Sequence, residues 1–588
     1  MRKSSRRGLF VLAALAGIHT VPAAAQGPGT SLELLRSEAA QAVLQAEAAD
    51  GHPVKCAVPA LFAALAQSGR AAGGPQRVRF SYTDPESFDS PGGGFRLHYT
   101  RSGVHAVLEG DADDDGVPDF IEAAAAALDS VRAGYLALGW REPPVDDVED
   151  PRYDVYFLDL PGFFGYVEPD ETPDRPPYVS SSHMVLENDY PPGIYGHPPL
   201  ESLRVTVAHE YHHAIQLAYS LPGVSPALYD YTWFAELSAT YHEDIFYDGI
   251  NDYYFYLPSF QNNPEVSLDA DGITVGPANH KYGAALWGWY MHRVFGESAN
   301  RRVWEIVGED RVTPLEAHRR FLQDEGTDLQ RAWGDFTLWQ VHTGSRADPA
   351  RYFEEGAAYP EVRTVDVPDL ETVSIDLPRL AAAYHLSPVP DPAPGGVALR
   401  VSPLQDSEWG IGAAGEGPSS ILSAAAVSAS PAGSGASLEL LDWSSYAFLL
   451  RWGWSGDNTD LTGTSVTASA DLEGRVSTHL TSDRVGGSGF HLLQNYPNPF
   501  RPGRMENTFF AFTLDQTDDV SLEVRSMNGR RVWYRRLGGM PPGRHFTADM
   551  DLGWDGRDEG GGYVSSGIYL LVARAGDTTR VLQFSVIR

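Results

Sequence analysis

The chain has 588 residues, of which 43% are hydrophobic, and a formal net charge of -34 at pH 7. A single hydrophobic core stops growing at roughly 250–300 residues, so this length predicts several domains, and the hydrophobic content argues against a disordered chain. The negative charge argues against a nucleic-acid binder, because proteins that follow a phosphate backbone usually present a basic face.

The first 25 residues have the pattern of a secretory signal peptide. Basic residues within positions 2–7 precede a short apolar stretch at 9–18, and small residues follow at 23–25. The apolar stretch is too short to span a bilayer, and no later segment approaches about 20 consecutive apolar residues. We therefore expect a protein that is secreted or held at the cell surface, without a membrane span in its mature form.

Residues 26–78 form a predicted helical N-terminal segment. Ser31 is a suitable N-cap, Ala-rich helical spacing continues to Ala49, and a second apolar stretch surrounds residues 61–65. The sequence allows two interpretations, a pro-segment that is removed or a packed subdomain that stays.

Residues 79–358 are predicted to form an α+β domain. Short alternating runs predict strands, and longer runs with helical periodicity lie between and after them. The predicted strands lie at 95–99 and 153–157, and the predicted helices at 119–139, 202–219, 231–246 and 282–295. Strands that are segregated from helices are typical of the α+β class.

Residues 111–122 match the spacing of a calcium-binding loop. Carboxylates occupy positions one, three, five, nine and twelve of the loop, and Gly116 at position six allows a sharp turn. The candidate ligands are Asp111, Asp113, Asp115, Asp119 and Glu122. We expect a structural calcium ion that fixes the start of the next helix, with an acidic helix-capping turn as the alternative.

Residues 205–216 carry a His-Glu-x-x-His motif. His209 and His213 are four residues apart, so on a helix both rings project from one face and fill two corners of a tetrahedral zinc site. Glu210 is placed to take a proton from zinc-activated water during attack on a carbonyl group. The apolar flanks predict a buried helix. Buried polar side chains need partners, so this burial argues against a chance match of the motif on a surface helix. His212 competes with His213 as a ligand, but choosing it would break the motif. We therefore expect His212 to orient the ligands or to contribute to packing.

Residues 233–239, Trp-Phe-Ala-Glu-Leu-Ser-Ala, resemble the downstream helix of gluzincin peptidases, in which a Trp-x-x-Glu-x-x-Ala segment supplies a glutamate ligand. The resemblance implies that Glu236 is the third zinc ligand. Glu243 lies two helical turns further along and can face the same helix, and we expect it to accept a hydrogen bond from a ligating imidazole. Many gluzincins have a glycine after the ligand glutamate, where this chain has Leu237.

The order of motifs from residue 79 to about residue 310 resembles a group of secreted bacterial metallopeptidases, which implies a zincin-like domain, zinc and peptide hydrolysis. Tyr282 opens a Tyr-Gly-Ala segment similar to helices that supply an oxyanion-stabilising tyrosine in related peptidases, with helix packing as the alternative role. His242 and His280 are weaker candidates. In zinc peptidases of this design an edge strand pairs with the substrate, and we expect residues 178–186 to provide it.

Cys56 is the only cysteine in the chain, so no disulfide can form within it. A lone cysteine is commonly a small buried hydrophobe. The second interpretation is that its thiolate occupies the open position of the zinc until the N-terminal segment is removed.

Helical periodicity ends after about residue 360, and two β domains are predicted. Strand-like runs separated by Pro-, Gly- and Ser-rich stretches predict a β-sandwich over residues 359–484. Residues 490–588 resemble the immunoglobulin-like C-terminal domain related to flagellar hook-capping proteins and to type IX secretion sorting domains. The resemblance rests on residues 492–503, 527–532, 554–558 and 566–569. It implies an interaction with a secretion machinery and an address outside the cell or on its surface.

These features predict a secreted zinc peptidase that acts on proteins or peptides with Glu210 as general base. The alternative is a calcium-stabilised surface or adhesion protein with a structural zinc site, and a third option is a zinc hydrolase acting on other bonds. A structural site needs no general base and is closed by a fourth protein ligand. Glu210 is present and the motifs supply no fourth ligand, which favours the peptidase.

Overall fold

The computed structural model of the chain resolves into two compact units. The first contains the described residues up to Phe260 together with Asp269–Ala317, and the second contains Gln261–Leu268 and the described residues from His318 to Arg588. The described residues are 35, 37–48, 53–61, 64, 80, 82–145, 150–160, 162–170, 179–219, 229–273, 275–368, 373–388, 396–403, 409–416, 421–429, 437–441, 448–455, 476–485, 490–496, 500–503, 507–514, 516–527, 529–545, 553–576 and 578–588. The signal peptide predicted over residues 1–25 lies outside them.

The first unit combines one mixed β-sheet with helices. Its strands are β1 (Pro85–Asp89), β2 (Phe95–Thr100), β3 (Tyr153–Leu158), β4 (Gly165–Pro169) and β5 (Ser182–Glu187). Its helices are α3 (Glu38–Ala48), α5 (Asp119–Ala137), α6 (Pro192–Tyr195), α7 (Pro199–Gln216), α8 (Tyr229–Tyr247), α10 (His280–Gly283), α11 (Ala285–Phe295) and α12 (Ala299–Asp310). The strands and helices predicted between residues 95 and 295 are confirmed within a few residues, except that the helix predicted at 282–295 is divided at Ala284. The first described helix begins at Glu38, and Ser31, the predicted N-cap, lies outside the described residues.

The strands of this sheet follow the order β1-β2-β3-β5-β4. β2, β3 and β5 are parallel neighbours, whereas β1 and β4 at the two edges run antiparallel to the strands beside them. Every residue of β5 is buried, because β5 lies between two strands and in contact with α7. The prediction that residues 178–186 form the edge strand for substrate is therefore wrong, and β4 is the edge strand on that side of the sheet.

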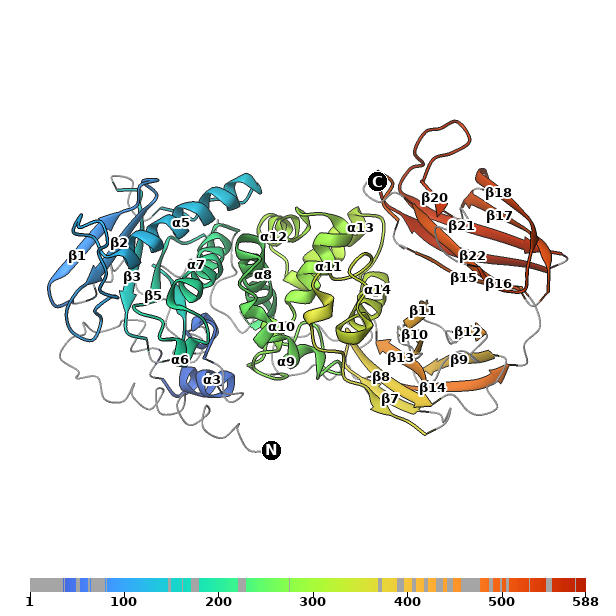
Figure 1. Ribbon diagram of the computed structural model, residues 1–588, viewed down its shortest axis with the longest axis horizontal. Helices are drawn as coiled ribbons and strands as arrows, with labels where there is room; N and C mark the ends of the chain where they lie inside the picture. The colour runs from blue at the N-terminus through green and yellow to red at the C-terminus, as the bar shows by residue number, and fades with distance from the viewer. Residues whose placement is uncertain are drawn as a thin grey trace. The chain divides into compact units, whose positions relative to one another are not determined.

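α7 lies between the sheet and α8, as Figure 1 shows, and it also contacts α5. Pro199 begins the helix, where the missing N–H of proline costs nothing because the first N–H groups of a helix have no partner within it. The residues from Val205 to Gln216 are all buried, polar ones included. Buried polar side chains need partners, so the polar residues of α7 must be satisfied by neighbouring elements.

We call residues 38–48 and 53–61 the N-terminal segment. Its Val43, Leu44 and Leu61 lie in one hydrophobic cluster with Phe163 and Tyr166, which flank the start of β4. This apolar packing holds the segment against the edge of the sheet, as burial of apolar surface is the main source of stability in such contacts.

The second unit is built mainly from β-sheets. Its described strands are β6 (Val365–Asp366), β7 (Val373–Leu377), β8 (Ala381–Pro388), β9 (Gly396–Pro403), β10 (Trp409–Glu416), β11 (Ile421–Ala429), β12 (Ser437–Leu441), β13 (Phe448–Ser455), β14 (Val476–Val485), β15 (His491–Tyr496), β16 (Thr508–Leu514), β17 (Asp518–Ser526), β18 (Arg531–Met540), β19 (Gly543–His545), β20 (Gly553–Trp554), β21 (Gly567–Ala575) and β22 (Thr578–Val586). It also contains α14 (Leu329–Val341), while α9 (Leu257–Gln261) and α13 (Pro314–Asp324) cross the boundaries between the units.

These strands form two pairs of sheets. The first pair has the orders β11-β10-β13-β8-β6 and β12-β9-β14-β7, and the second has β15-β16-β19, with β20 beside β16, and β18-β17-β21-β22. In the second pair, Phe512, Trp554 and Leu571 from the two sheets share one hydrophobic core, which is the arrangement of a β-sandwich. The chain is thus multidomain, with helices and several β-sheets, as the sequence predicts.

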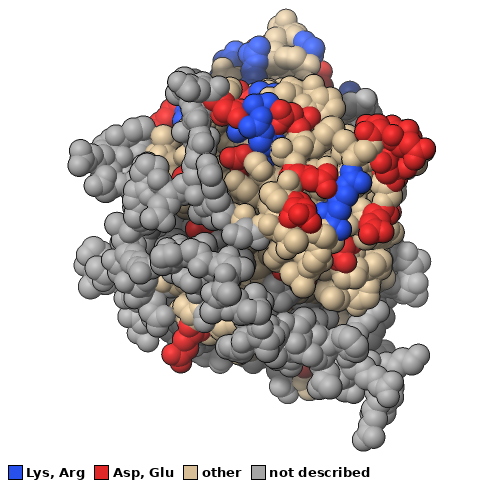
Figure 2. Space-filling model, turned by 90° about the vertical axis from the view of Figure 1, so that its left-hand side faces the viewer, with Lys and Arg blue, Asp and Glu red and all other residues tan. Residues whose placement is uncertain are grey.

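The surface carries much of the negative charge. Figure 2 shows acidic side chains in several groups on one face of the molecule, with Lys and Arg side chains between them. Arg96, for example, lies 2.8 Å from Asp89 and 2.6 Å from Asp150, so part of the charge is compensated locally. Among the described residues, no helix is both long and apolar enough to cross a membrane.

Candidate metal centre

Two neighbouring helices bring the candidate zinc ligands together. His209 and His213 project from α7, and Glu236 projects from α8. The Nε2 atoms of the two histidines are 3.1 Å apart, and Glu236 Oε2 lies 3.2 Å from the first and 3.5 Å from the second. Ligand atoms about 2.0–2.1 Å from one zinc ion at tetrahedral angles lie about 3.3 Å apart. The three atoms therefore have the spacing of three corners of a tetrahedral site.

The hydrogen bonds of the two Nδ1 atoms determine which ring nitrogens of His209 and His213 are free to bind a metal. His209 Nδ1 lies 2.7 Å from Glu243 Oε1, and His213 Nδ1 lies 2.9 Å from Gln216 Oε1. Gln216 donates its amide N–H to Ala235 O at 2.9 Å, which orients the amide oxygen toward the ring. Both Nδ1 atoms therefore donate, and in the neutral rings both Nε2 atoms carry lone pairs. When both rings are neutral, two lone pairs face each other 3.1 Å apart, an arrangement that either a metal ion or a proton on one of the rings would stabilise.

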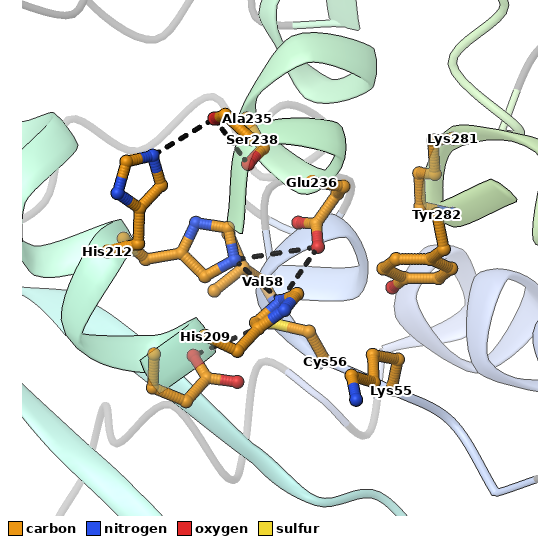
Figure 3. A network of polar contacts seen from close by, with 12 residues as sticks. Lys55, Cys56, Val58, His209, His212, Ala235, Glu236, Ser238, Lys281 and Tyr282 are labelled. Atoms are coloured by element: carbon orange, nitrogen blue, oxygen red, sulfur yellow. Dashed lines mark hydrogen bonds and ion pairs between the residues drawn. The ribbon is translucent and has the colours of Figure 1, made fainter. Parts of the chain in front are cut away.

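A fourth candidate ligand comes from the N-terminal segment. Cys56 Sγ, one ring nitrogen each of His209 and His213, and an oxygen of Glu236 all lie within 4.8 Å of one another, and all four side chains are buried. Figure 3 shows Cys56, His209 and Glu236 directed toward one point. One cysteine, two histidines and one glutamate form a donor set that suits zinc, so the residues present fit the ion that the sequence predicts.

Glu210 lies beside this cluster. Its Oε2 accepts a hydrogen bond from Cys56 Sγ at 3.6 Å, and its buried Oε1 has no hydrogen-bond partner among the residues that the structure describes. A buried carboxylate oxygen without a hydrogen bond lowers the stability of the fold unless a ligand or a water molecule donates a hydrogen bond to it. Burial, the largest effect, raises the pKa of Glu210, and the charge of His209 opposes the increase.

The cluster favours positive charge when no metal is bound. Burial acts to lower the pKa of His209, but the hydrogen bonds to Glu236 and Glu243 outweigh it and raise that pKa to about 9. For Glu236, burial acts to raise the pKa, and the charge of His213 with the hydrogen bond from His209 outweighs it and lowers the pKa to about 2. A metal ion that binds here takes the place of the protons that these groups otherwise hold.

β4 passes unusually close to α7 at Gly165. A Cβ atom at this position would lie 2.9 Å from Val185 O and 3.2 Å from Glu210 Cγ. Only glycine leaves room for the strand to run directly against the candidate base.

His212, the competing histidine of the motif, faces away from the cluster. Its Nε2 lies 3.0 Å from Ser238 Oγ, and its ring stacks on His242 with 4.3 Å between the ring centroids. Burial lowers the pKa of His212 well below its ordinary value and that of His242 to about 3. Both rings therefore stay neutral and belong to the packing between α7 and α8. His280, also buried, packs on Phe260.

Tyr282 lies next to the cluster on α10. Its ring centroid is 6.3 Å from that of His209, and its hydroxyl donates to Glu47 Oε2 at 3.3 Å. Glu47 belongs to the N-terminal segment, and Figure 3 shows the Tyr282 ring beside Glu236. The oxyanion role assigned to Tyr282 by resemblance stays a prediction.

Several residues of the site have no signal in the motifs. Lys55 is buried and contacts Glu243 Oε2 at 2.7 Å as well as Asp252. Gln216 orients His213 from the same helix, three residues further along, so helical spacing is a signal that would have found it. Lys55, Asp252 and Glu47 are distant in sequence from the ligands, and only the tertiary structure brings them to the site.

The predicted calcium loop is partly assembled. Asp111, Asp113 and Asp115 bring carboxylate oxygens within 4.8 Å of one another, whereas Asp119 and Glu122 are not part of this group. Asp111 accepts hydrogen bonds from the backbone N–H groups of residues 115 and 116. Burial, together with the charges of its acidic neighbours, raises the pKa of Glu122. Calcium binding stays a prediction.

No protein-family model and no curated protein matches the chain. Among solved structures it is similar to PorZ, a surface component of the type IX secretion system of Porphyromonas gingivalis, with 20% identity over 19% of this chain and 14% of PorZ and a TM-score of 0.13. It is also similar to latent PorU from the same organism, with 13% identity over 38% and 32% of the two chains and a TM-score of 0.15. A β-glucuronidase from Parabacteroides merdae has 12% identity over 34% and 27%, with a TM-score of 0.16. The chain spans less than a third of the length of each, and similarity at these TM-scores carries no argument about activity.

Proposed function

We propose that this protein is an exported zinc peptidase with a zincin-like catalytic unit. The observation that carries the proposal is the arrangement of His209 Nε2, His213 Nε2 and Glu236 Oε2 at the mutual distances of a tetrahedral zinc site, beside the unpartnered Oε1 of Glu210. A metal triad next to a buried carboxylate is the donor set of zinc hydrolases that act through water.

Each side chain has a role in this proposal. The chemistry that zinc supplies when bound is Lewis acidity, which polarises a carbonyl group and makes water easier to deprotonate. Glu210 accepts the proton from the attacking water and passes it to the leaving amine. Glu243 and Gln216 hold the histidine rings in orientation through Nδ1. Tyr282 donates a hydrogen bond to the oxygen on which negative charge develops.

A second candidate function is favoured by Cys56. With this residue the chain provides four protein ligands, as closed structural zinc sites do. The protein would then be a calcium-stabilised surface or adhesion protein. The unpartnered oxygen of Glu210 favours the peptidase, because a structural site has no use for a buried carboxylate beside its metal.

The remaining assignments belong to the same proposal. The loop at 111–122 would hold a structural calcium ion, and the substrate would be a protein or peptide. The motifs in residues 490–588 support an interaction with a secretion machinery and a location outside the cell or on its surface.

The experiment that tests the proposal compares Glu210→Gln with Glu201→Gln, a substitution of the same type at the other end of α7. Both are made in the zinc-loaded full-length chain and in its Cys56→Ser variant, and each protein is incubated with a diverse peptide pool that is read by mass spectrometry. We expect Glu210→Gln to keep zinc and to lose about 10²–10⁴-fold in hydrolysis, while Glu201→Gln changes neither. Equal hydrolysis by the Cys56→Ser protein and by its Glu210→Gln derivative would overturn the role of Glu210.

A further inference from the structure

The N-terminal segment sends three side chains into the proposed catalytic site. Cys56 Sγ lies within 4.8 Å of a ligand atom of each of the other three members of the metal cluster, close enough to supply a fourth ligand. Lys55 contacts Glu243 at 2.7 Å, the carboxylate that orients His209. Glu47 accepts the hydroxyl hydrogen bond of Tyr282 at 3.3 Å. The segment thus contacts three parts of the site at the same time: the metal cluster, the carboxylate that orients His209, and the candidate oxyanion donor Tyr282.

The same segment pairs with the chain at the edge of the sheet, where β4 begins. Val54 N donates to Gly162 O at 2.9 Å and Phe164 N donates to Val54 O at 3.2 Å, while Ala57 N donates to Gly165 O at 3.1 Å. Val54 and Phe163 form a parallel bridge. An exposed edge strand is the place where an extended peptide adds to a sheet, so residues 54–57 occupy the position that a substrate would need.

The metal cluster is also buried. His209, Glu210 and Glu236 have no exposed surface, and His213 is 4% exposed. Hydrolysis requires that water and a peptide reach these groups, because a catalytic site keeps one metal position open. Cys56 beside the cluster and residues 54–57 along the start of β4 lie where a water molecule and a peptide would have to bind.

We propose that the N-terminal segment is an inhibitory segment that occupies the substrate site and holds the metal in a latent state through Cys56, an inference that rests on the proposed peptidase function. A thiol that coordinates a metal does so as the thiolate, so the Cys56 proton is lost when the metal binds. Displacement or removal of the segment then opens the fourth metal position, frees the edge at β4 and releases Tyr282 from Glu47. One movement therefore uncovers three parts of the site.

The test uses the full-length chain loaded with Co²⁺, because a thiolate on cobalt gives a sulfur-to-metal charge-transfer band that imidazole and carboxylate ligands do not give. Three proteins are compared: wild type, Cys56→Ser, and the control Val58→Thr. The control also places a hydroxyl in the buried part of the segment, where Val58 is 3% exposed, but it keeps the thiol. Acetohydroxamate, a small metal chelator, probes whether the fourth position is open.

We expect the wild type and Val58→Thr to show the charge-transfer band, to leave their cobalt spectrum unchanged with acetohydroxamate, and to hydrolyse peptides slowly. Cys56→Ser should lack the band and bind acetohydroxamate, because the segment has lost its bond to the metal. The zinc-loaded Cys56→Ser protein should hydrolyse the peptide pool at least about tenfold faster. Absence of the band in the wild type, or equal hydrolysis by wild type and Cys56→Ser, would overturn the inhibitory segment and leave the peptidase proposal standing. If Cys56→Ser binds acetohydroxamate and no protein cleaves any peptide, the peptidase function itself fails, the inhibitory role fails with it, and Cys56 is a ligand of a structural site.

Discussion

The Cys56 thiol lies against the Glu210 carboxylate, with Sγ 3.6 Å from Oε2. The residue proposed to activate water therefore faces a thiol of the N-terminal segment. Burial, followed by the charge of Glu210, raises the pKa of the Cys56 thiol well above its ordinary value, so without a cation the sulfur keeps its proton and donates a hydrogen bond to Glu210. A metal ion in the cluster reverses this preference and draws the sulfur toward itself as thiolate. The occupancy of the metal site thus decides the state of both residues.

Metal analysis can distinguish the role of Glu236 as a metal ligand from the role of Glu243 as the hydrogen-bond partner that orients His209. Glu236→Ala should purify with little zinc, whereas Glu243→Ala should keep the metal with an affinity about 10–100-fold lower. Both changes are made in the Cys56→Ser background, because the thiol would otherwise replace the missing carboxylate. If Glu243→Ala is the variant that loses zinc entirely, the two roles are reversed.

Close packing at Gly165 should be essential for turnover. The Cβ atom of Gly165→Ala would lie 2.9 Å from Val185 O and 3.2 Å from Glu210 Cγ, so β4 has to shift and the Glu210 side chain is displaced with it. In the Cys56→Ser background we expect at least a tenfold loss of kcat with unchanged zinc content, since a small misplacement of a catalytic group is costly. Gly193→Ala is the control, because a Cβ there meets no atom within 4 Å; a similar loss in both variants would contradict the explanation.

His183 should make stability depend on pH. Burial acts to lower its pKa, but Asp170 and Glu168, with atoms 3.1 Å and 3.4 Å away, outweigh burial and raise the pKa to about 9. Because the folded pKa lies above the ordinary value of about 6.5, the stabilisation is fully present below pH 6.5 and is lost as the pH rises through 9. The difference in Tm between wild type and His183→Gln should therefore be larger at pH 6 than at pH 9.5. A difference that grows with pH would refute this.

Calcium should raise the Tm of the wild type through the loop at 111–122. Asp115→Asn should abolish this increase, and it keeps an oxygen that can accept the 2.8 Å hydrogen bond from Val117 N. Asp114→Asn removes the same charge from a residue that lies outside the carboxylate group, so it should still respond to calcium. If calcium raises the Tm of both variants equally, the increase comes from the negative charge of the protein as a whole and not from a specific site in this loop.

The sequence by itself determined those features that depend on neighbours along the chain. The spacing of His209 and His213 follows from helical periodicity, and α5, α7 and α8 begin and end close to their predicted bounds. Helical periodicity does not reveal close contacts between distant elements. Gly283 therefore lay within one predicted helix, although a Cβ there would be 2.6 Å from Tyr256 O, at the point where α10 ends.

Only the tertiary structure decided what surrounds the metal centre. β5 has the composition expected of a strand, but its interior place in the sheet depends on which strands pair with it. In this sheet β4 pairs with β5 and is the edge strand. Lys55, Cys56 and Glu47 lie far from the ligands in sequence, with Lys55 separated from Glu243 by 188 residues. Their position is set by the apolar contacts of the N-terminal segment with Phe163 and Tyr166. These long-range contacts are specified by shape and burial, and no local pattern encodes them.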